Sequence, residues 1–368
     1  MFKAEELFQN ITDRNHPDET VLTIIQGKGT LPREQAGRNI HYDDASLSNY
    51  KKVEQGDFII HLRSFEGGLE MANEAGIVSP AYTILRCKRP HSSLFYDAYF
   101  HTDEFINHNL SKSVEGIRDG RQISYEAFKW LGIPYCEPTE QEKISTLFSA
   151  FNERIAKQRD LVESLKKYKR GVNNQILSQI DNSYNCRLGS VCEIVGGGTP
   201  DTLHAEYWGN TVEWFTPSEI GKTKYVNNSV RKLSDIGLDN SSAKLLPIGT
   251  VLLTTRATLG EMSIAKRECS TNQGFQSLIP HTDRVSSEYL YYMQIIIKPW
   301  CEKYASGNTF REISKSALSD CIIPIPDRAR QEQIVKLLSS IDMTIDAAES
   351  ISMSLSKIRH GLMQQLFI

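Results

Sequence analysis

The sequence lacks any long apolar segment. Its longest apolar run, Tyr289 to Ile297, is nine residues long and already includes Gln294, whereas a membrane-spanning helix needs about 20. The amino-terminal stretch MFKAEELFQN is charged and has no apolar core of the kind found in secretory signals. We therefore expect a cytoplasmic protein without a membrane span.

Cysteine is sparse and shows no pattern. The seven cysteines are odd in number and scattered, and no CxxC spacing occurs. Disulfide frameworks and zinc sites both depend on regular spacing, so these residues are expected to be reduced thiols. The nine histidines are also dispersed and include no HExxH pair. We expect no metal site in this chain.

Sequence motifs of the common catalytic sites are missing. The one glycine cluster, Gly196-Gly197-Gly198-Thr199-Pro200, has neither the GxGxxG nor the GxxxxGK spacing, and its proline argues against a phosphate-binding helix start. We interpret it as a turn in a surface loop. There is no GxSxG, no Asn-Pro-Pro or Asp-Pro-Pro aromatic tetrapeptide of amino-methyltransferases, and no clear carboxylate pair with a lysine for phosphodiester cleavage. These absences together predict a protein that is not an enzyme and holds no cofactor.

The chain also lacks the positive charge of a free-standing nucleic-acid-binding protein. It carries 42 Lys and Arg against 45 Asp and Glu, a net charge of −3, whereas such proteins are usually basic. If it binds DNA, local basic patches or a partner protein must supply the positive charge. The length of 368 residues predicts two or three domains.

What the sequence does contain is a duplication. Residues 133–177 align without a gap to residues 323–367 at a constant shift of 190 positions, as Gln141 to Gln331 and Gly171 to Gly361 show. A repeat of this length indicates a duplicated domain rather than a solenoid.

Both copies have the heptad spacing of a long amphipathic helix. A helix of about 38 residues is roughly 57 Å long and needs a partner to cover its apolar side. We therefore predict that the two copies pair antiparallel about a pseudo-twofold axis, and that the wide apolar stripe leaves surface over for another protein. Two amphipathic helices buried in separate cores are the alternative. The predicted core of the pair comprises Ile144, Phe148, Phe151, Ile155, Leu165, Ile334, Leu338, Ile341, Ile345 and Leu355.

The blocks outside the helices repeat each other more faintly. A shift of 193 sets Gly56 to Arg63 against Gly249 to Arg256, and Tyr82 against Phe275, while the rest diverges. Short β-type runs bounded by Gly, Asn and Pro predict an α+β fold with a small, curved, mostly antiparallel or mixed sheet in each block. The predicted domains are a first globular block (1–132), a central long helix (133–182), a second globular block (183–322) and a carboxy-terminal long helix (323–368).

Several polar side chains suit DNA. Arg63 and Arg256 stand at matched strand ends, where an arginine beside a glycine can reach a guanine edge or a phosphate; a structural salt bridge is the alternative. Asn272 and Gln273 have the amide groups that pair with adenine, but they are also common turn residues. Further candidates are Ser64 and Thr258 beside the two arginines, Lys28 and Arg33 in the first block, and Thr216, Ser218 and Lys222 in the second.

With these residues in view, the whole chain resembles the specificity (S) subunit of type I restriction–modification systems. The second block carries the family's typical Gly197-Gly198-Thr199-Pro200, Tyr207-Trp208-Gly209 and Thr271-Asn272-Gln273-Gly274-Phe275, and both helices begin with Gln-Glu-x-Ile. The first block has Arg63-Ser64-Phe65-Glu66-Gly67-Gly68 and a second family-like stretch from Ile77 to Tyr82. It lacks the Gly-Gly-Thr-Pro and Tyr-Trp signatures. It looks like a different lineage of the same domain.

The resemblance implies two target recognition domains that read the two halves of a bipartite, asymmetric DNA site, with the helix pair setting the gap. It adds Tyr82 and Thr199 to the candidate DNA-binding residues. It implies binding to two modification (methyltransferase) subunits and to restriction/translocase subunits in a prokaryotic cell, with S-adenosylmethionine, ATP and Mg²⁺ bound only by those partners. Two alternatives are a coiled-coil adaptor without sequence-specific DNA binding and the reader of a self-contained methyltransferase or nuclease.

Overall fold

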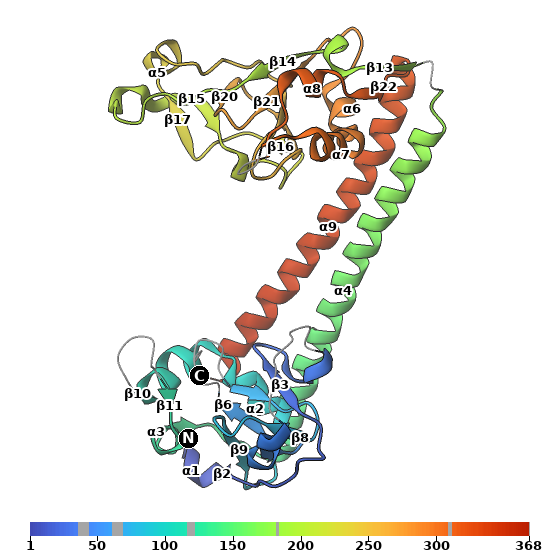
Figure 1. Ribbon diagram of the computed structural model, residues 1–368. Helices are drawn as coiled ribbons and strands as arrows, with labels where there is room; N and C mark the ends of the chain where they lie inside the picture. The colour runs from blue at the N-terminus through green and yellow to red at the C-terminus, as the bar shows by residue number, and fades with distance from the viewer. Residues whose placement is uncertain (36–43, 61–68, 116–121, 182–183, 308–310, 368) are drawn as a thin grey trace. The chain divides into compact units, whose positions relative to one another are not determined.

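The computed structural model describes residues 1–35, 44–60, 69–115, 122–181, 184–307 and 311–367 (Figure 1). The chain forms two compact units: unit 1 is Met1–Leu161 with Ala348–Ile368, and unit 2 is Val162–Ala347. The long helices α4 (Pro138–Ser178) and α9 (Arg328–Leu366) each contribute residues to both units. They are thus shared between the two units. In the described part of the chain, no helix has the length and apolarity needed to cross a membrane.

Unit 1 is built on a four-stranded antiparallel sheet with the strand order β2-β9-β6-β7. One face of this sheet is covered by helix α2 (Ser93–Phe100), whose aromatic side chains pack with Phe8 and Phe58. The strands and short helices of this unit are β1 (Phe2–Lys3), α1 (Ala4–Leu7), β2 (Phe8–Ile11), β3 (Leu22–Ile25), β4 (Gly29–Pro32), β5 (Lys51–Val53), β6 (Phe58–Ile60), β7 (Leu69–Met71), β8 (Gly76–Val78), β9 (Thr83–Cys87), β10 (Val114–Glu115), β11 (Gln122–Ile123), α3 (Tyr125–Phe128) and β12 (Gly132–Ile133).

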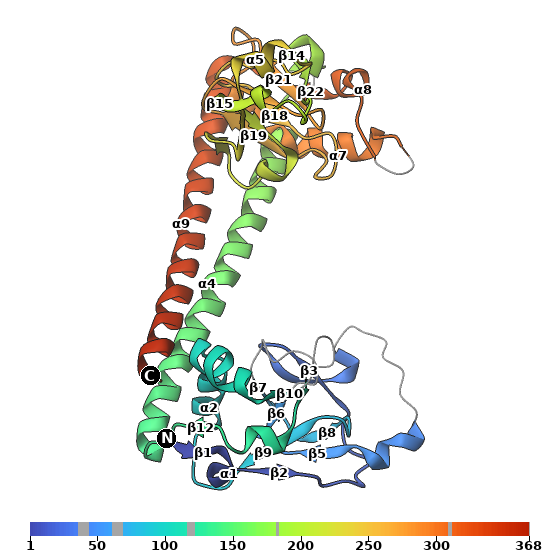
Figure 2. The ribbon, with the colours of Figure 1, turned by 90° about the vertical axis from the view of Figure 1, so that its left-hand side faces the viewer.

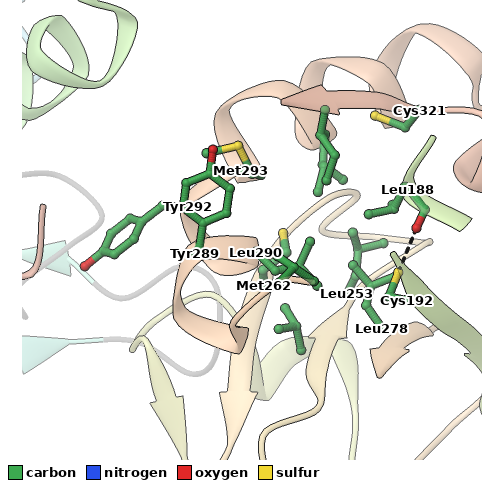
Figure 3. Packing of buried hydrophobic residues seen from close by; sticks show 14 of the residues in the cluster. Leu188, Cys192, Leu253, Met262, Leu278, Tyr289, Leu290, Tyr292, Met293 and Cys321 are labelled. Carbon is green, nitrogen blue, oxygen red and sulfur yellow. Dashed lines mark hydrogen bonds between the residues drawn. The ribbon is translucent and has the colours of Figure 1, made fainter. Parts of the chain in front are cut away.

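Unit 2 has a five-stranded mixed sheet, β14-β21-β18-β19-β16, and a three-stranded sheet, β17-β15-β20. Figure 3 shows how side chains of the larger sheet, such as Leu253 and Leu278, pack near Leu290 of helix α6. The elements are β13 (Asn185–Arg187), β14 (Cys192–Gly196), β15 (Trp208–Phe215), β16 (Tyr225–Val226), β17 (Arg231–Leu233), α5 (Asp235–Asp239), β18 (Val251–Leu253), β19 (Met262–Ala265), β20 (Cys269–Thr271), β21 (Gln276–Pro280), α6 (Ser287–Tyr292), α7 (Gln294–Tyr304), α8 (Lys315–Ser319) and β22 (Ile322–Pro324).

The two sheets have the same internal register, which confirms the duplication of the globular blocks. Phe58 pairs with Leu85 in unit 1, and Val251 pairs with Leu278 in unit 2, each 193 positions later. The equivalence also extends beyond the hairpin visible in the sequence, because β2 and β14 each pair antiparallel with the corresponding strand, β9 or β21. The α+β class with one antiparallel and one mixed sheet is therefore confirmed. Residues of different sequence build the same sheet because burial, and not side-chain identity, selects a strand position.

The long helices begin next to prolines. Helix α4 begins at Pro138 itself, since proline suits the first turn, where its missing N–H is not needed. Helix α9 begins after Asp327, whose carboxylate accepts the Arg330 N–H at 2.9 Å.

Each helix also begins with a fully buried glutamine that joins it to its globular block. In unit 1, the Gln141 side chain accepts the Ser92 N–H at 2.9 Å and donates to the Cys136 carbonyl at 2.8 Å. In unit 2, Gln331 accepts the Ser286 N–H at 3.1 Å and donates to the Pro326 carbonyl at 2.9 Å. Ser92 and Ser286 precede α2 and α6, so the same contact fixes a long helix to a block helix in both units.

The helices pair antiparallel, as predicted, and lie side by side in both views (Figures 1 and 2). In unit 1, Phe148 of α4 stacks on Phe367 near the end of the chain, with ring centroids 6.3 Å apart. In unit 2, Lys169 of α4 forms an ion pair with Asp342 of α9. The buried Gln158 side chain donates to the backbone carbonyl of Ala348 at 3.0 Å. Ala348 is the counterpart of Gln158 in the duplication, and such a self-contact is expected where two copies of one helix cross antiparallel.

Most of the predicted helix-pair core is buried. Phe148, Ile155, Ile334, Leu338, Ile341 and Ile345 are each at most 7% exposed. The remaining four predicted core residues are only half-buried: Ile144, Phe151, Leu165 and Leu355. Two helices alone cannot cover an apolar stripe this wide from every side.

Candidate nucleic-acid interface

Four segments that are distant in the sequence meet at one place in unit 2. The Thr199 hydroxyl, which follows β14, is hydrogen-bonded to the Gln273 side chain in the loop between β20 and β21. The same loop contacts the end of β15, where the Asn272 N–H donates to the Phe215 carbonyl at 3.1 Å. Thr258, which follows β18, lies with its hydroxyl 3.4 Å from the Pro217 carbonyl. The structure thus brings together most of the candidates predicted for the second block.

The glycine cluster makes this meeting possible. A Cβ atom at Gly197 would lie 2.0 Å from the Asn272 carbonyl oxygen, and one at Gly198 would lie 2.3 Å from the Ser242 hydroxyl. The backbone of the cluster is also held by a side chain: the Trp214 indole N–H donates to the Gly198 carbonyl at 3.0 Å. The predicted turn in a surface loop is not formed, because Gly196 ends β14 and Gly198 is buried. Gly197 and Gly198 instead permit a close backbone crossing under the candidate site.

The polar residues around this crossing differ in whether their side chains are hydrogen-bonded within the protein or exposed. Thr216 and Glu219 form a capping box around the short 3-10 helix Pro217–Glu219, whereas Ser218 is exposed. The side-chain Oδ1 of Asn272 accepts the Gly274 N–H at 2.8 Å, which is the turn role that the sequence leaves open. Gln273 is exposed and points its amide toward Thr199. Ser218, Thr258 and Gln273 are the side chains best placed to reach a ligand.

Arg256 forms a salt bridge. Its guanidinium lies 2.8 Å from the carboxylate of Glu312, with the arginine side chain 42% exposed. Arg256 thus forms the structural salt bridge that the sequence analysis gave as the alternative to a DNA contact. Its counterpart Arg63 and the neighbouring Ser64 lie outside the described residues.

Most of the basic residues near Lys222 are held by structural contacts. The Lys224 ammonium donates to the hydroxyls of Tyr292 and Ser339, both at 3.1 Å. Arg231 stacks 3.4 Å from the ring centroid of Trp208, and Lys232 pairs with the buried Glu213 at 2.7 Å. Lys222 is exposed and, within the described residues, makes no ion pair.

In unit 1, Lys28 occupies the turn between β3 and β4. This turn is anchored by Glu70, whose carboxylate accepts the Gly27 N–H at 2.6 Å and the Gly29 N–H at 2.9 Å. Burial raises the pKa of Glu70, but the nearby His101 imidazole, 3.6 Å away, and the hydrogen bonds from the two glycine N–H groups outweigh it and hold that pKa below its ordinary value. Glu70 is 2% exposed. Sequence reasoning missed it, although a lone glutamate in a short apolar strand is a signal that could have been noticed.

The other candidates of unit 1 are less exposed. Tyr82 is half-buried, and burial raises the pKa of its hydroxyl although the neighbouring charge of Arg33 opposes this. The Lys51 ammonium donates to the Tyr82 carbonyl at 2.6 Å. Arg33 is half-buried as well. These two residues thus border the core of the block, while Lys28 projects from it.

A second surface lies on the long helices, and we name it the apolar stripe. It consists of large apolar side chains that are 40–59% exposed and occur at counterpart positions of the duplication: Leu147 and Leu337, Leu161 and Ile351, Tyr168 and Ile358. This confirms that pairing leaves apolar surface over. The adjacent basic run from Lys166 to Arg170 is partly neutralised, since Lys169 pairs with Asp342 and Lys166 lies 3.7 Å from Glu163.

Comparison with known proteins agrees with this architecture. Residues 180–356 match the family model described as type I restriction modification DNA specificity domain. The chain is 34% identical over 186 residues to the type I restriction enzyme MjaIX specificity subunit of Methanocaldococcus jannaschii, which covers 50% of this chain and 43% of that protein. It is 24% identical over 254 residues to the EcoR124I/EcoR124II specificity subunit of Escherichia coli, covering 65% and 62%. The matched region therefore spans less than two thirds of either relative.

Solved structures resemble the chain over its whole length. The HsdS subunit from Thermoanaerobacter tengcongensis has a TM-score of 0.51 at 19% identity, with 100% of this chain and 95% of that chain covered. A structure that describes complex assembly and conformational transition of a type I R-M system has a TM-score of 0.65 at 19% identity, with 100% and 96% covered. At such identities the likeness establishes the fold.

The fold and the matched domain define a duplicated α+β protein in which each globular block is joined to one copy of a long, paired helix. Residues 180–356 match the type I restriction modification DNA specificity domain, and the chain has the fold of the HsdS subunit. The comparisons support neither of the two alternatives, the adaptor without DNA recognition and the self-contained enzyme.

Proposed function

We propose that this chain is the non-catalytic DNA-reading subunit of a type I restriction–modification complex. Each globular block reads one half of a bipartite site, and the helix pair sets the gap between the halves. The chain needs no cofactor of its own. S-adenosylmethionine, ATP and Mg²⁺ belong to partner subunits, and the complex acts in the cytoplasm.

One observation carries this proposal: the two blocks share a sheet register but differ in the loops around it. Glu70 and Ser263 occupy the same register position, opposite Ile59 and Leu252, yet they have unlike chemistry. In unit 2, β15 pairs in parallel with β20 over three positions, whereas unit 1 has a single parallel bridge, Val21 to Ile77, at the equivalent place. A shared frame with unlike surfaces suits two readers of different sequences, so the target is expected to be asymmetric.

We expect the exposed polar loops to read bases, and basic side chains to position the protein on the DNA. Hydrogen bonds to base edges carry sequence information, whereas contacts to phosphates fix the protein on the duplex. Ser218, Thr258 and Gln273 form such a polar loop surface in unit 2. The modest net charge of −3 suits a subunit whose partners also contribute to DNA binding.

The function is tested by mapping methyladenine across the genome with and without this gene. We expect one gapped, two-part motif to lose methylation when the gene is deleted. A control strain with residues 183–322 replaced by the corresponding block of a relative should methylate a motif in which one half and not the other has changed. If deletion removes no gapped motif, or if the swap changes both halves, the proposal is wrong.

The apolar stripe is proposed to bind the modification subunits. Replacing Leu161 or Ile351 with aspartate should weaken capture of a modification subunit at least about 30-fold, because a buried hot-spot side chain contributes about 2 kcal/mol or more. Both residues are 47% exposed, so folding should be preserved. Binding is measured by co-purification and by titration of the labelled subunit.

The matched control is Met353→Asp. Met353 is 74% exposed and lies about 200° around the same helix from Ile351, away from the apolar stripe. It undergoes the same apolar-to-acidic change. Equal loss of binding in I351D and M353D would contradict the assignment of the stripe.

A further inference from the structure

Each block has a glycine–lysine pair in a loop beside the duplicated sheet, and the two pairs differ by one position from the block shift of 193. Gly27-Lys28 in unit 1 and Gly221-Lys222 in unit 2 are 194 positions apart, and both glycines have a positive φ, +70° and +86°. A positive φ is the conformation that glycine adopts without strain. In each case a left-handed glycine is followed directly by an exposed lysine.

Both turns are anchored by the same position of the duplicated sheet. In unit 1 the anchor is Glu70 on β7, which accepts the two glycine N–H groups that flank Lys28. In unit 2 it is the fully buried Ser263 on β19, which accepts the Gly221 N–H at 3.2 Å and donates to the Thr223 carbonyl at 2.7 Å. Glu70 and Ser263 are 193 positions apart and face equivalent residues of the neighbouring strand.

A second contact holds the main chain at Lys28, and another holds it two residues after Lys222. The Asn73 side chain donates to the Lys28 carbonyl at 2.7 Å, and the Lys28 N–H donates to the Ile25 carbonyl at 3.0 Å. In unit 2 the Ile264 N–H donates to the Lys224 carbonyl at 2.8 Å. The main chain around each lysine is thus held by buried or strand residues, while the side chain stays exposed.

The charges of the two lysines are also not neutralised by any carboxylate that the structure describes. Neither forms an ion pair with any residue that the structure describes, in contrast to Lys52, Lys232 and Arg256, which pair with carboxylates. Lys28 borders a hollow of about 650 Å³ that is also lined by Arg159 and Arg359 and by the carboxylates of Glu70 and Asp97. An exposed, uncommitted ammonium on a fixed backbone is suited to an anion of the kind that repeats along DNA.

We propose that Lys28 and Lys222 are corresponding phosphate-contacting residues, one in each reader block. They position each half-site without reading it, while the unlike loops around them read bases. This inference rests on the proposed function. It explains why the lysine and its glycine recur although the anchoring side chain has changed from a carboxylate to a hydroxyl.

The experiment measures binding of the assembled complex to a labelled duplex carrying the mapped methylation motif, and to a random duplex of equal length, across a salt series. K28A and K222A should each lower the slope of log affinity against log salt concentration by about 0.9, and the double variant by about twice that, since one released counterion accompanies each phosphate contact. Affinity should fall for both duplexes, and the methylated motif should stay unchanged. K28R and K222R should keep the slope.

Lys315→Ala is the matched control, because Lys315 is an exposed lysine at the start of α8, on another element of unit 2. It should leave the slope unchanged. The inference is overturned if K28A and K222A behave like K315A, or if either one changes the motif that is methylated. If the unsubstituted complex does not distinguish the two duplexes at all, the proposed function itself fails.

Discussion

Replacing Gln331 with methionine is expected to lower the free energy of unfolding of unit 2 by about 3 kcal/mol. The Gln331 side chain accepts the Ser286 N–H and donates to the carbonyls of Arg284 and Pro326 at 2.8 and 2.9 Å. Methionine has a similar volume, so the change removes hydrogen bonds without opening a large cavity. Each buried backbone group left unpaired costs about 1–3 kcal/mol.

The measurement is urea unfolding followed by tryptophan fluorescence, which reports mainly on unit 2 because Trp208, Trp214 and Trp300 all lie there. The control is Gln333→Met, an exposed glutamine two residues further along the same helix, which should stay within about 0.5 kcal/mol of the unsubstituted protein. A loss below about 1 kcal/mol for Q331M would show that the contact does not hold the helix to its block.

Gly197→Ala is expected to have an effect of similar size and to abolish reading of one half-site. The added methyl group would lie 2.0 Å from the Asn272 carbonyl oxygen and 2.4 Å from the Thr271 hydroxyl. Because both neighbours belong to a strand end and its loop, relief requires the backbone that carries Gln273 to move. Overpacking of this kind costs about 1–3 kcal/mol or more.

The same glycine cluster supplies the control. A Cβ at Gly196 would meet nothing closer than the Gln276 side chain at 3.8 Å, so Gly196→Ala should fold and read DNA normally. Stability is measured by urea unfolding and reading by the methylated motif in cells. If G197A is as stable and as selective as G196A, the close crossing does not shape the candidate interface.

The structural elements that depend on a periodic residue pattern could be predicted from the sequence. The paired helices, their antiparallel direction and the residual apolar stripe follow from heptad spacing and from a 190-residue repeat, because burial along a helix recurs at fixed intervals. The sheet strands followed from short β-branched and apolar runs. Helices α6 and α7 occupy the apolar run from Tyr289 to Ile297 and its flanks, and they are separated at Met293.

The candidate site was predictable only in part. The candidates Thr199, Thr216, Ser218, Thr258, Asn272 and Gln273 lie close together in the structure, which the sequence did not predict. Arg256 is held by Glu312, a partner 56 positions away that no local pattern indicates. Glu70 and Ser263 were missed for the same reason. Their role is to bind a turn from another part of the chain, and the sequence does not state which turn reaches which strand.

The sequence by itself determined the duplication, the α+β class, the long helix pair and the absence of recognisable catalytic motifs, because each of these depends on spacing or residue type along the chain. Only the tertiary structure decided which basic residues are committed to salt bridges and which, like Lys28 and Lys222, remain exposed on anchored turns. That choice depends on contacts between segments far apart in the sequence, where distance and burial, and not residue type, determine what a side chain can bind.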